Sequence, residues 1–129
     1  MKPFIPAISW LLVILIISGY PGSYVPEIPV WQFDKLVHIA IYAVLSFCLL
    51  IPYHKQYIKE NKRLKLGLII FLISTFYGGF MEILQNNIFI NRSGNWYDFT
   101  ANSIGAIIGV ILYPLLINFL PINRWLKIK

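Results

Sequence analysis

Four apolar runs divide this chain, and each is close to the length of a membrane-spanning helix. A helix needs about 20 residues to cross about 30 Å of hydrocarbon, and at that depth every backbone polar group must bond within its own segment. The sequence therefore predicts a single-domain, all-α, integral membrane four-helix bundle spanning residues 1–129. The predicted helices cover about residues 4–20, 34–53, 66–85 and 98–120.

The composition agrees with a membrane protein. The chain is 58% hydrophobic and only 12% charged, whereas a soluble domain is about a quarter charged. Its apolar runs are hydrophobic all round, which argues against helices lying flat on a membrane surface. The single cysteine, Cys48, excludes an intramolecular disulfide. We expect the first run to be a retained helix, because Ser18-Gly19-Tyr20-Pro21 makes a poor signal-peptide cleavage site.

Basic residues are concentrated on one side of the expected bundle. Positive charge in short loops marks the cytoplasmic side of a membrane protein. Both termini are therefore expected in the cytoplasm, in a multi-pass protein of the plasma (inner) membrane. The net charge of +6 then reflects topology, so the expected partner is the lipid bilayer and not nucleic acid. Nine of the 11 basic residues lie on this side: Lys2, Lys55, Lys59, Lys62, Arg63, Lys65, Arg124, Lys127 and Lys129.

A set of polar residues gathers on the opposite, extracytoplasmic side. Ionisable groups at membrane depth are costly, so they tend to be paired, inward-facing and functional. Because helix direction alternates, the start of the second run, the end of the third and the start of the fourth meet on this side. Spacings of three or four residues place neighbouring members on one helix face. The set is Asp34, Lys35, His38, Glu82, Gln85, Arg92, Asp98 and Asn102.

Some members of this set have a structural interpretation as well. Asp34 and Asp98 open their runs, where aspartate is a favoured N-cap. Glu82 has no such local explanation, so we expect it to be protonated or to pair with one of its basic neighbours. Those candidate partners are His38, Lys35 and Arg92.

Glycine and amide residues on the same faces are expected to contribute to helix packing. Gly78, Gly105 and Gly109 predict close approach between helices, and Gln85 and Asn102 can bond across them. A homo-oligomer that associates through the Gly105 and Gly109 face is one further expectation.

The sequence requires no cofactor. It contains no phosphate-binding loop and no dinucleotide fingerprint. His54 is expected on the cytoplasmic side, away from His38, which argues against a two-histidine metal centre within one protomer. His38 with Asp34, Glu82 and Asp98 could still hold a divalent ion through nitrogen and oxygen ligands, although the spacing does not demand one.

The ordered combination of these motifs resembles the VanZ-like family of membrane proteins. The resemblance covers roughly residues 34–113 and implies a small multi-span protein with an envelope-facing role. The family's namesake is associated with resistance to the glycopeptide antibiotic teicoplanin. This chain resembles a minimal version of the family, with little beyond the shared core. The pattern is Asp34-Lys35-x-x-His38-x-x-x-Tyr42, Gly78-x-x-Met81-Glu82-Ile83-x-Gln85, Arg92 and Asp98-x-x-x-Asn102-x-x-Gly105-x-x-x-Gly109.

Ligand binding is the function that we favour for the polar set. The expected ligand is an envelope lipid, a glycan precursor or a glycopeptide-type molecule. Lys35 and Arg92 would hold an anionic headgroup. The complete set of candidate binding residues is Lys35, Tyr42, Gln85, Arg92 and Asn102.

Two alternatives to simple binding stay open. In the first, the protein is a membrane enzyme, with His38 and Glu82 performing acid–base chemistry on an anionic envelope substrate. Asp34 and Asp98 are the further catalytic candidates. In the second, the polar residues form a purely structural network that fixes helix register.

Overall fold

Four long helices form the body of the molecule. The computed structural model describes residues 2–20, 31–89, 96–121 and 124. Within these residues, four helices are long and apolar enough to cross a membrane, which confirms the predicted all-helical membrane fold. They are α1 (Ile5–Gly19), α2 (Trp31–Leu50), α4 (Arg63–Asn87) and α5 (Trp96–Leu116). The shorter elements are η1 (Lys2–Phe4), η3 (Ile51–Tyr53), α3 (His54–Ile58) and η4 (Ile117–Phe119).

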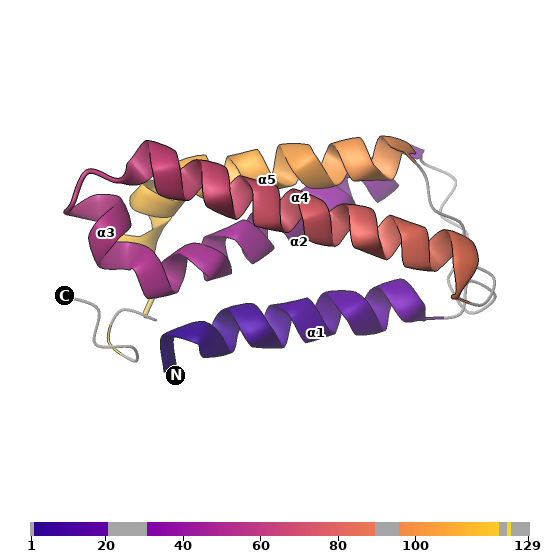
Figure 1. Ribbon diagram of the computed structural model, residues 1–129, viewed down its shortest axis with the longest axis horizontal. Coiled ribbons are helices and arrows are strands. Elements are labelled where there is room, and N and C mark those ends of the chain that lie inside the picture. Colours follow the sequence, from indigo (N-terminus) through magenta and orange to yellow (C-terminus); the bar gives the residue numbers. More distant parts are fainter. Residues whose placement is uncertain (1, 21–30, 90–95, 122–123, 125–129) are drawn as a thin grey trace.

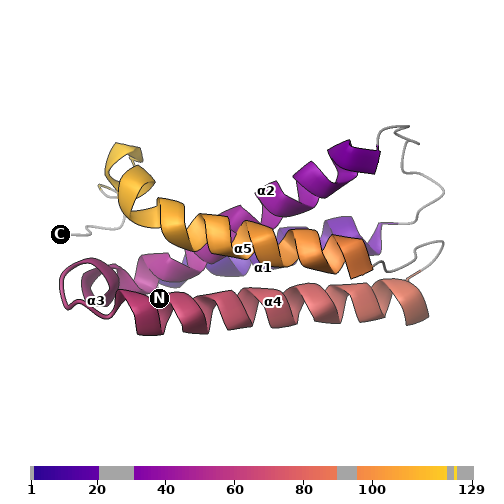
Figure 2. The same ribbon diagram turned by 90° about the horizontal axis from the view of Figure 1, so that it is seen from above.

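The long helices lie side by side and alternate in direction (Figure 1). The start of α1, the short α3 and the end of α5 lie at one end of the bundle, which we call the basic end. The end of α1, the start of α2, the end of α4 and the start of α5 lie at the other, which we call the site end. The α2–α5 interface is the most extensive, α4 packs on α5, and α1 contacts α2 and α4. Figure 2 shows α2 crossing the bundle obliquely, so that its start diverges from α4.

Apolar side chains fill the interior and also cover much of the outer surface. A buried cluster near the basic end includes Tyr57 and Tyr113, and a second cluster includes Leu45 and Met81. Many large apolar side chains nevertheless face outward; Phe76, for example, is 78% exposed. An apolar surface of this extent suits contact with hydrocarbon rather than water.

A close helix contact lies between α2 and α5 and depends on two glycines. A Cβ atom placed on Gly105 would lie 2.2 Å from the carbonyl oxygen of Ile39. A Cβ atom on Gly109 would lie 2.1 Å from the hydroxyl oxygen of Ser46 and 2.2 Å from the carbonyl oxygen of Ala43. Small residues let backbones approach in this way in membranes. Because α2 of the same chain covers this face, any self-association would have to use another surface, and the homo-oligomer stays a prediction.

Side-chain donors tie the helices together at membrane depth. Each of them donates to a backbone carbonyl of a neighbouring element. The donor thereby gains a hydrogen-bond partner that lipid tails cannot provide. The four bonds are Trp10 Nε1 to Ile41 O (2.9 Å), Ser46 Oγ to Ala106 O (2.9 Å), Tyr57 Oη to Val110 O (2.9 Å) and Tyr77 Oη to Leu11 O (2.6 Å).

The observed helices extend beyond some of the predicted boundaries. The predictions counted apolar residues, whereas the helices continue through polar residues at the site end: α2 includes Trp31 and α5 begins at Trp96. Asp34 and Asp98 consequently lie within the first helical turn, so their interpretation as N-caps is wrong. They still interact favourably with the positive end of each helix dipole.

The remaining boundaries also have local explanations. Helix α4 covers Arg63–Asn87, beyond both ends of the predicted 66–85 segment. Asn61 adopts a left-handed backbone (φ 55°) in the turn before α4, a conformation that asparagine tolerates better than most residues. Pro114 lies inside the last turn of α5, where it removes a backbone donor, and the chain continues as η4.

Candidate functional site

Five polar residues from α2 and α5 come together at the site end. We call them the paired cluster: Asp34, Lys35, His38, Asp98 and Asn102. Three of them lie on the first two turns of α2, and two lie on the first two turns of α5. The close contact at Gly105 and Gly109 holds the two helices together further toward the basic end. The α2–α5 contact therefore brings residues about 63 positions apart within bonding distance.

Lys35 links the two aspartates of the paired cluster. Its ammonium group donates to Asp98 and lies 3.3 Å from Oδ2 of Asp34. The side chains of Lys35 and Asp98 are only 13% and 12% exposed, whereas that of Asp34 is 55% exposed. The charge of Lys35 is thus engaged with carboxylates of its own chain. Binding an anionic headgroup with Lys35, as the sequence suggested, would compete with these ion pairs.

His38 is held in one orientation by Asn102. Its Nδ1 lies 2.8 Å from Oδ1 of Asn102, and because an amide oxygen only accepts, Nδ1 carries the hydrogen. In the neutral ring, Nε2 then has the free lone pair. That atom lies 3.9 Å from Oδ1 of Asp34 and 3.8 Å from Oδ2 of Asp98. His38 therefore presents a basic nitrogen between two carboxylates.

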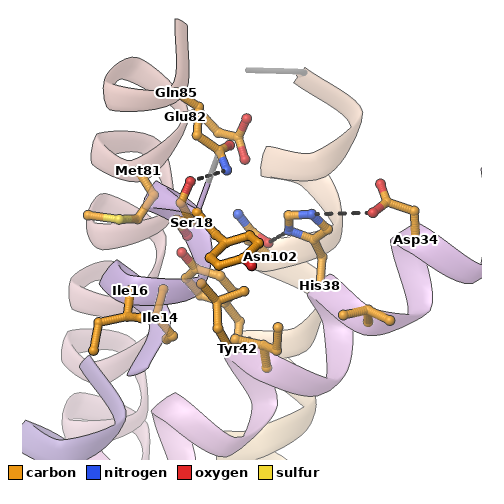
Figure 3. Close-up of a pocket in the computed structure, with 14 residues that line it drawn as sticks. Ile14, Ile16, Ser18, Asp34, His38, Tyr42, Met81, Glu82, Gln85 and Asn102 are labelled. Carbon is orange, nitrogen blue, oxygen red and sulfur yellow. Dashed lines mark hydrogen bonds and ion pairs between the residues drawn. The ribbon is translucent and has the colours of Figure 1, made fainter. Parts of the chain in front are cut away.

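A cavity of about 410 Å³ opens beside the paired cluster. Figure 3 shows Glu82 and Gln85 on α4 facing His38 and Asn102 across it. Gln85 donates from Nε2 to the carbonyl oxygen of Ser18 at 3.3 Å, which ties α4 to α1 at the rim. The lining residues are Ile14, Ile16, Ile17, Ser18, Tyr20, Asp34, Val37, His38, Ile41, Tyr42, Met81, Glu82, Gln85 and Asn102.

Glu82 belongs to the α4 wall of this cavity. It is only 8% exposed, on the side of the cavity opposite His38. The contacts described above for His38 run to Asp34, Asp98 and Asn102, and the pairing of Glu82 with one of its candidate partners stays a prediction. The predicted partner Arg92 lies outside the described residues.

The floor of the cavity depends on a glycine in α4. A Cβ atom on Gly78 would lie 3.1 Å from Nδ2 of Asn102 and 3.2 Å from Cε1 of Tyr42. Gly78 therefore leaves room for both side chains. Tyr42 is 3% exposed and Asn102 is 1% exposed. Among the described residues, Nδ2 of Asn102 has no hydrogen-bond partner, which leaves a buried donor beside the cavity.

Helix α1 forms a wall that the sequence did not reveal. Ile14, Ile17 and Ser18 line the cavity, and the polar contribution of Ser18 comes from its backbone carbonyl. A backbone acceptor carries no sequence signal, and isoleucines in an apolar helix look alike whichever way they face. The contribution of α1 could therefore be found only from the fold.

One group of side chains in the described part of the chain has the composition of a metal site. Asp34, His38 and Asp98 each offer a ligand atom, and these atoms lie within 4.8 Å of one another. The set that the sequence suggested also contained Glu82, which the structure places on the other cavity wall.

The fold and the site define a small multi-pass membrane protein with polar residues gathered at one end of a helical bundle. The model of the VanZ/LLP1 family matches residues 4–117, so the chain belongs to the VanZ-like family. This match confirms the resemblance seen in the motifs and extends it to α1. Neither the curated proteins nor the solved structures contain a match to the chain.

Proposed function

We propose that this protein binds an envelope lipid by placing the lipid's polar headgroup in the cavity at the site end. The observation that supports the proposal is the two-sided lining of that cavity. Asp34, His38 and Asn102 give it one polar wall, whereas Ile14 and Ile17 give it an apolar one. An amphiphile matches both kinds of wall at once.

The buried polar groups favour a ligand rich in hydrogen-bonding atoms. An unsatisfied buried donor is unfavourable by about 1–3 kcal/mol. The amide Nδ2 of Asn102 is such a donor among the described residues, and a headgroup oxygen would satisfy it. The carboxylate of Asp34 would in turn accept from headgroup hydroxyl or amine groups.

The cavity size favours a headgroup over a larger ligand. Small-molecule sites usually occupy about 300–1,000 Å³, and this cavity has about 410 Å³. That volume suits a lipid headgroup and is small for a whole glycopeptide antibiotic. Among the ligands suggested by the sequence, we therefore favour the lipid.

The positive charge of the basic end supports the proposal that the cavity lies in the outer half of the plasma membrane. The segment from α3 through the following turn to the start of α4 carries Lys55, Lys59, Lys62, Arg63 and Lys65 at the end opposite the cavity. Positive loops stay in the cytoplasm. On this proposal the site end faces the extracytoplasmic side.

Cysteine labelling tests this orientation. In a Cys48→Ala background, Asn87→Cys and Glu60→Cys place single exposed thiols at the site end and the basic end. A membrane-impermeant maleimide applied to intact spheroplasts is expected to label Asn87→Cys at once, and Glu60→Cys only after permeabilisation. The reverse pattern would place the cavity on the cytoplasmic side.

A cavity-filling substitution tests lipid binding. Ser18 lines the cavity, and its structural acceptor is its backbone carbonyl, so Ser18→Phe should occupy the space without removing the bond to Gln85. Native mass spectrometry of detergent-purified protein is expected to show bound lipid for the wild type. For Ser18→Phe we expect at least about tenfold weaker retention of a defined phospholipid, which corresponds to about 1.4 kcal/mol.

The matched control lies on the same helix. Ser9 is exposed and does not line the cavity, so Ser9→Phe should keep wild-type lipid retention. Equal loss in both variants, or a wild-type protein without retained lipid, would contradict the proposal.

Catalysis is the second candidate function, and the orientation of His38 favours it. An imidazole held through Nδ1 with a free Nε2 has the arrangement of a general base. Incubation of the protein with the lipid that it retains distinguishes the two functions, because a binding protein returns the lipid unchanged and an enzyme returns it with altered mass.

A further inference from the structure

The first two turns of α2 and α5 place an imidazole nitrogen and two carboxylate oxygens around one point. We infer that Asp34, His38 and Asp98 form a binding site for a divalent metal ion at the edge of the cavity. Their ligand atoms lie within 4.8 Å of one another, and Nε2 of His38 is 3.9 Å and 3.8 Å from the nearest oxygens of the two aspartates. One nitrogen and two oxygen ligands suit an ion of the zinc type.

The orientation of His38 is the one that a metal ligand needs. Histidines that bind metals almost always donate their second ring nitrogen to a protein acceptor, which fixes the ring and directs the free lone pair. Asn102 supplies this acceptor at 2.8 Å from Nδ1. The lone pair on Nε2 therefore points toward the space that the two aspartates share.

Lys35 leaves one oxygen of each aspartate available. It contacts Oδ2 of Asp34 and Oδ1 of Asp98, whereas the atoms nearest His38 are Oδ1 of Asp34 and Oδ2 of Asp98. With both carboxylates ionised and Lys35 protonated, these three groups carry a net negative charge. Both Lys35 and Asp98 are largely shielded from solvent, which strengthens the attraction for a cation.

The ligand atoms, which lie within 4.8 Å of one another, would have to draw together around an ion. Zinc binds nitrogen and oxygen at about 2.0–2.2 Å, so ligand atoms in a tetrahedral site lie about 3.3–3.5 Å apart. The observed separations from Nε2 are 3.9 Å and 3.8 Å. Rotation of the half-exposed Asp34 side chain can close part of this difference. Three protein ligands leave a fourth position open, as in catalytic zinc sites.

A second feature indicates that the cavity beside the metal site receives a polar ligand. Asp34 and His38 line the cavity, so the metal site lies at its edge. Nδ2 of Asn102 also lies beside the cavity, in a residue that is 1% exposed, and has no hydrogen-bond partner among the described residues. Because Asn102 bonds to Nδ1, its amide lies across the imidazole ring from Nε2, so another polar group of the cavity ligand, and not the metal-bound atom, would accept this hydrogen bond.

The metal would also determine which headgroup the cavity accepts. The carboxylate of Asp34 disfavours a phosphate, whereas a bound divalent ion adds positive charge and an open coordination position. We therefore assign a phosphate-bearing headgroup to the metal-loaded protein. This assignment of the ligand rests on the proposed lipid function, but metal binding itself does not.

Zinc titration of the full-length protein tests the site without lipid. Protein purified in detergent, free of a histidine tag and of added metal, is titrated with Zn²⁺ by calorimetry, and bound metal is counted by elemental mass spectrometry. We expect one zinc ion per chain. Asp34→Asn, at a half-exposed position, should weaken binding at least about tenfold, and Asn102→Leu, which removes the support of His38, about 10–100-fold.

The chain supplies matched controls for both ligand types. His54 is the other of the two histidines and bonds to Tyr113 at the basic end, and Glu60 is an exposed carboxylate paired with Lys62. His54→Gln and Glu60→Gln should bind zinc like the wild type. Wild-type affinity in Asp34→Asn, or an equal loss in His54→Gln, would overturn the site.

The two proposals fail in different ways. Ser18→Phe should lose lipid and keep zinc, because Ser18 lines the cavity without belonging to the ligand set. Removal of metal with a chelator should weaken retention of a phosphate-bearing lipid in the wild type. Zinc binding with unchanged lipid retention after chelation would keep the metal site and refute the phosphate assignment.

Discussion

Alanine at Gly105 or Gly109 is expected to separate α2 from α5 and to leave little folded protein. The added methyl group would lie 2.2 Å from the carbonyl oxygen of Ile39 in the first variant and 2.2 Å from that of Ala43 in the second. Backbone atoms cannot rotate away as a flexible side chain can, so the helices themselves must move. Overpacking is usually unfavourable by about 1–3 kcal/mol and occasionally by more, and we expect these two variants at the upper end.

Thermal stability in detergent measures this effect. Fluorescence-detected size-exclusion chromatography after a temperature ramp reports the fraction of folded protein for each variant. Gly19→Ala is the matched control, because a Cβ atom there would lie 3.5 Å from the Phe89 ring, an ordinary contact distance. A Gly105→Ala protein as stable as Gly19→Ala would show that the α2–α5 contact is looser than described.

Replacing Lys35 by methionine is expected to destabilise the protein by about 3–5 kcal/mol. The substitution removes the ammonium group that contacts both Asp98 and Asp34. Asp98 is only 12% exposed in its side chain, so its carboxylate would lose its ion pair in a poorly solvated position. Breaking one side of a shielded ion pair is more harmful than replacing both partners by apolar groups.

A double-mutant cycle measures this coupling. The variants are Lys35→Met, Asp98→Leu and the two together, compared by their unfolding temperatures in the same detergent. We expect the double variant to be more stable than Lys35→Met alone, because the shielded carboxylate of Asp98 is then no longer left without its ion pair. Additive losses would show that the ion pair does not couple the two helices.

This cycle also separates stability from binding. Asp98 belongs both to the ion pair and to the inferred metal site. A double variant that folds but no longer binds zinc would demonstrate a binding role beyond helix register. If the polar residues served register alone, loss of any function would follow loss of folded protein.

The membrane made the helices of this chain predictable, but not their ends. Hydrocarbon thickness fixes the length of an apolar segment, so four runs of suitable length gave four helices. Hydropathy changes at the first polar residue, whereas a helix continues as long as its backbone bonds are satisfied. For this reason the sequence offers Asp34 and Asp98 an interpretation as caps, although they lie inside helices.

Spacing and helix direction predicted where the polar residues gather, but not how they pair. Alternating helices bring the start of α2 and the start of α5 to one end, which places His38 near Asn102. The choice between Glu82 and Asp98 as a neighbour depends on how far each helix is rotated about its axis. That rotation is set by the contacts of Gly105 and Gly109 with α2, which a single sequence does not specify.

The cavity wall formed by α1 has a consequence for selectivity. This helix contributes isoleucine side chains and a backbone carbonyl, whereas the charged and amide side chains come from α2, α4 and α5. A substitution at Ile14 or Ile17 would therefore change the width of the cavity and leave its charge unchanged. A substitution of similar size at Asp34 would change the charge of the cavity and leave its width unchanged. Selection of a ligand by size and selection by chemical type are thus assigned to different helices and can be altered independently.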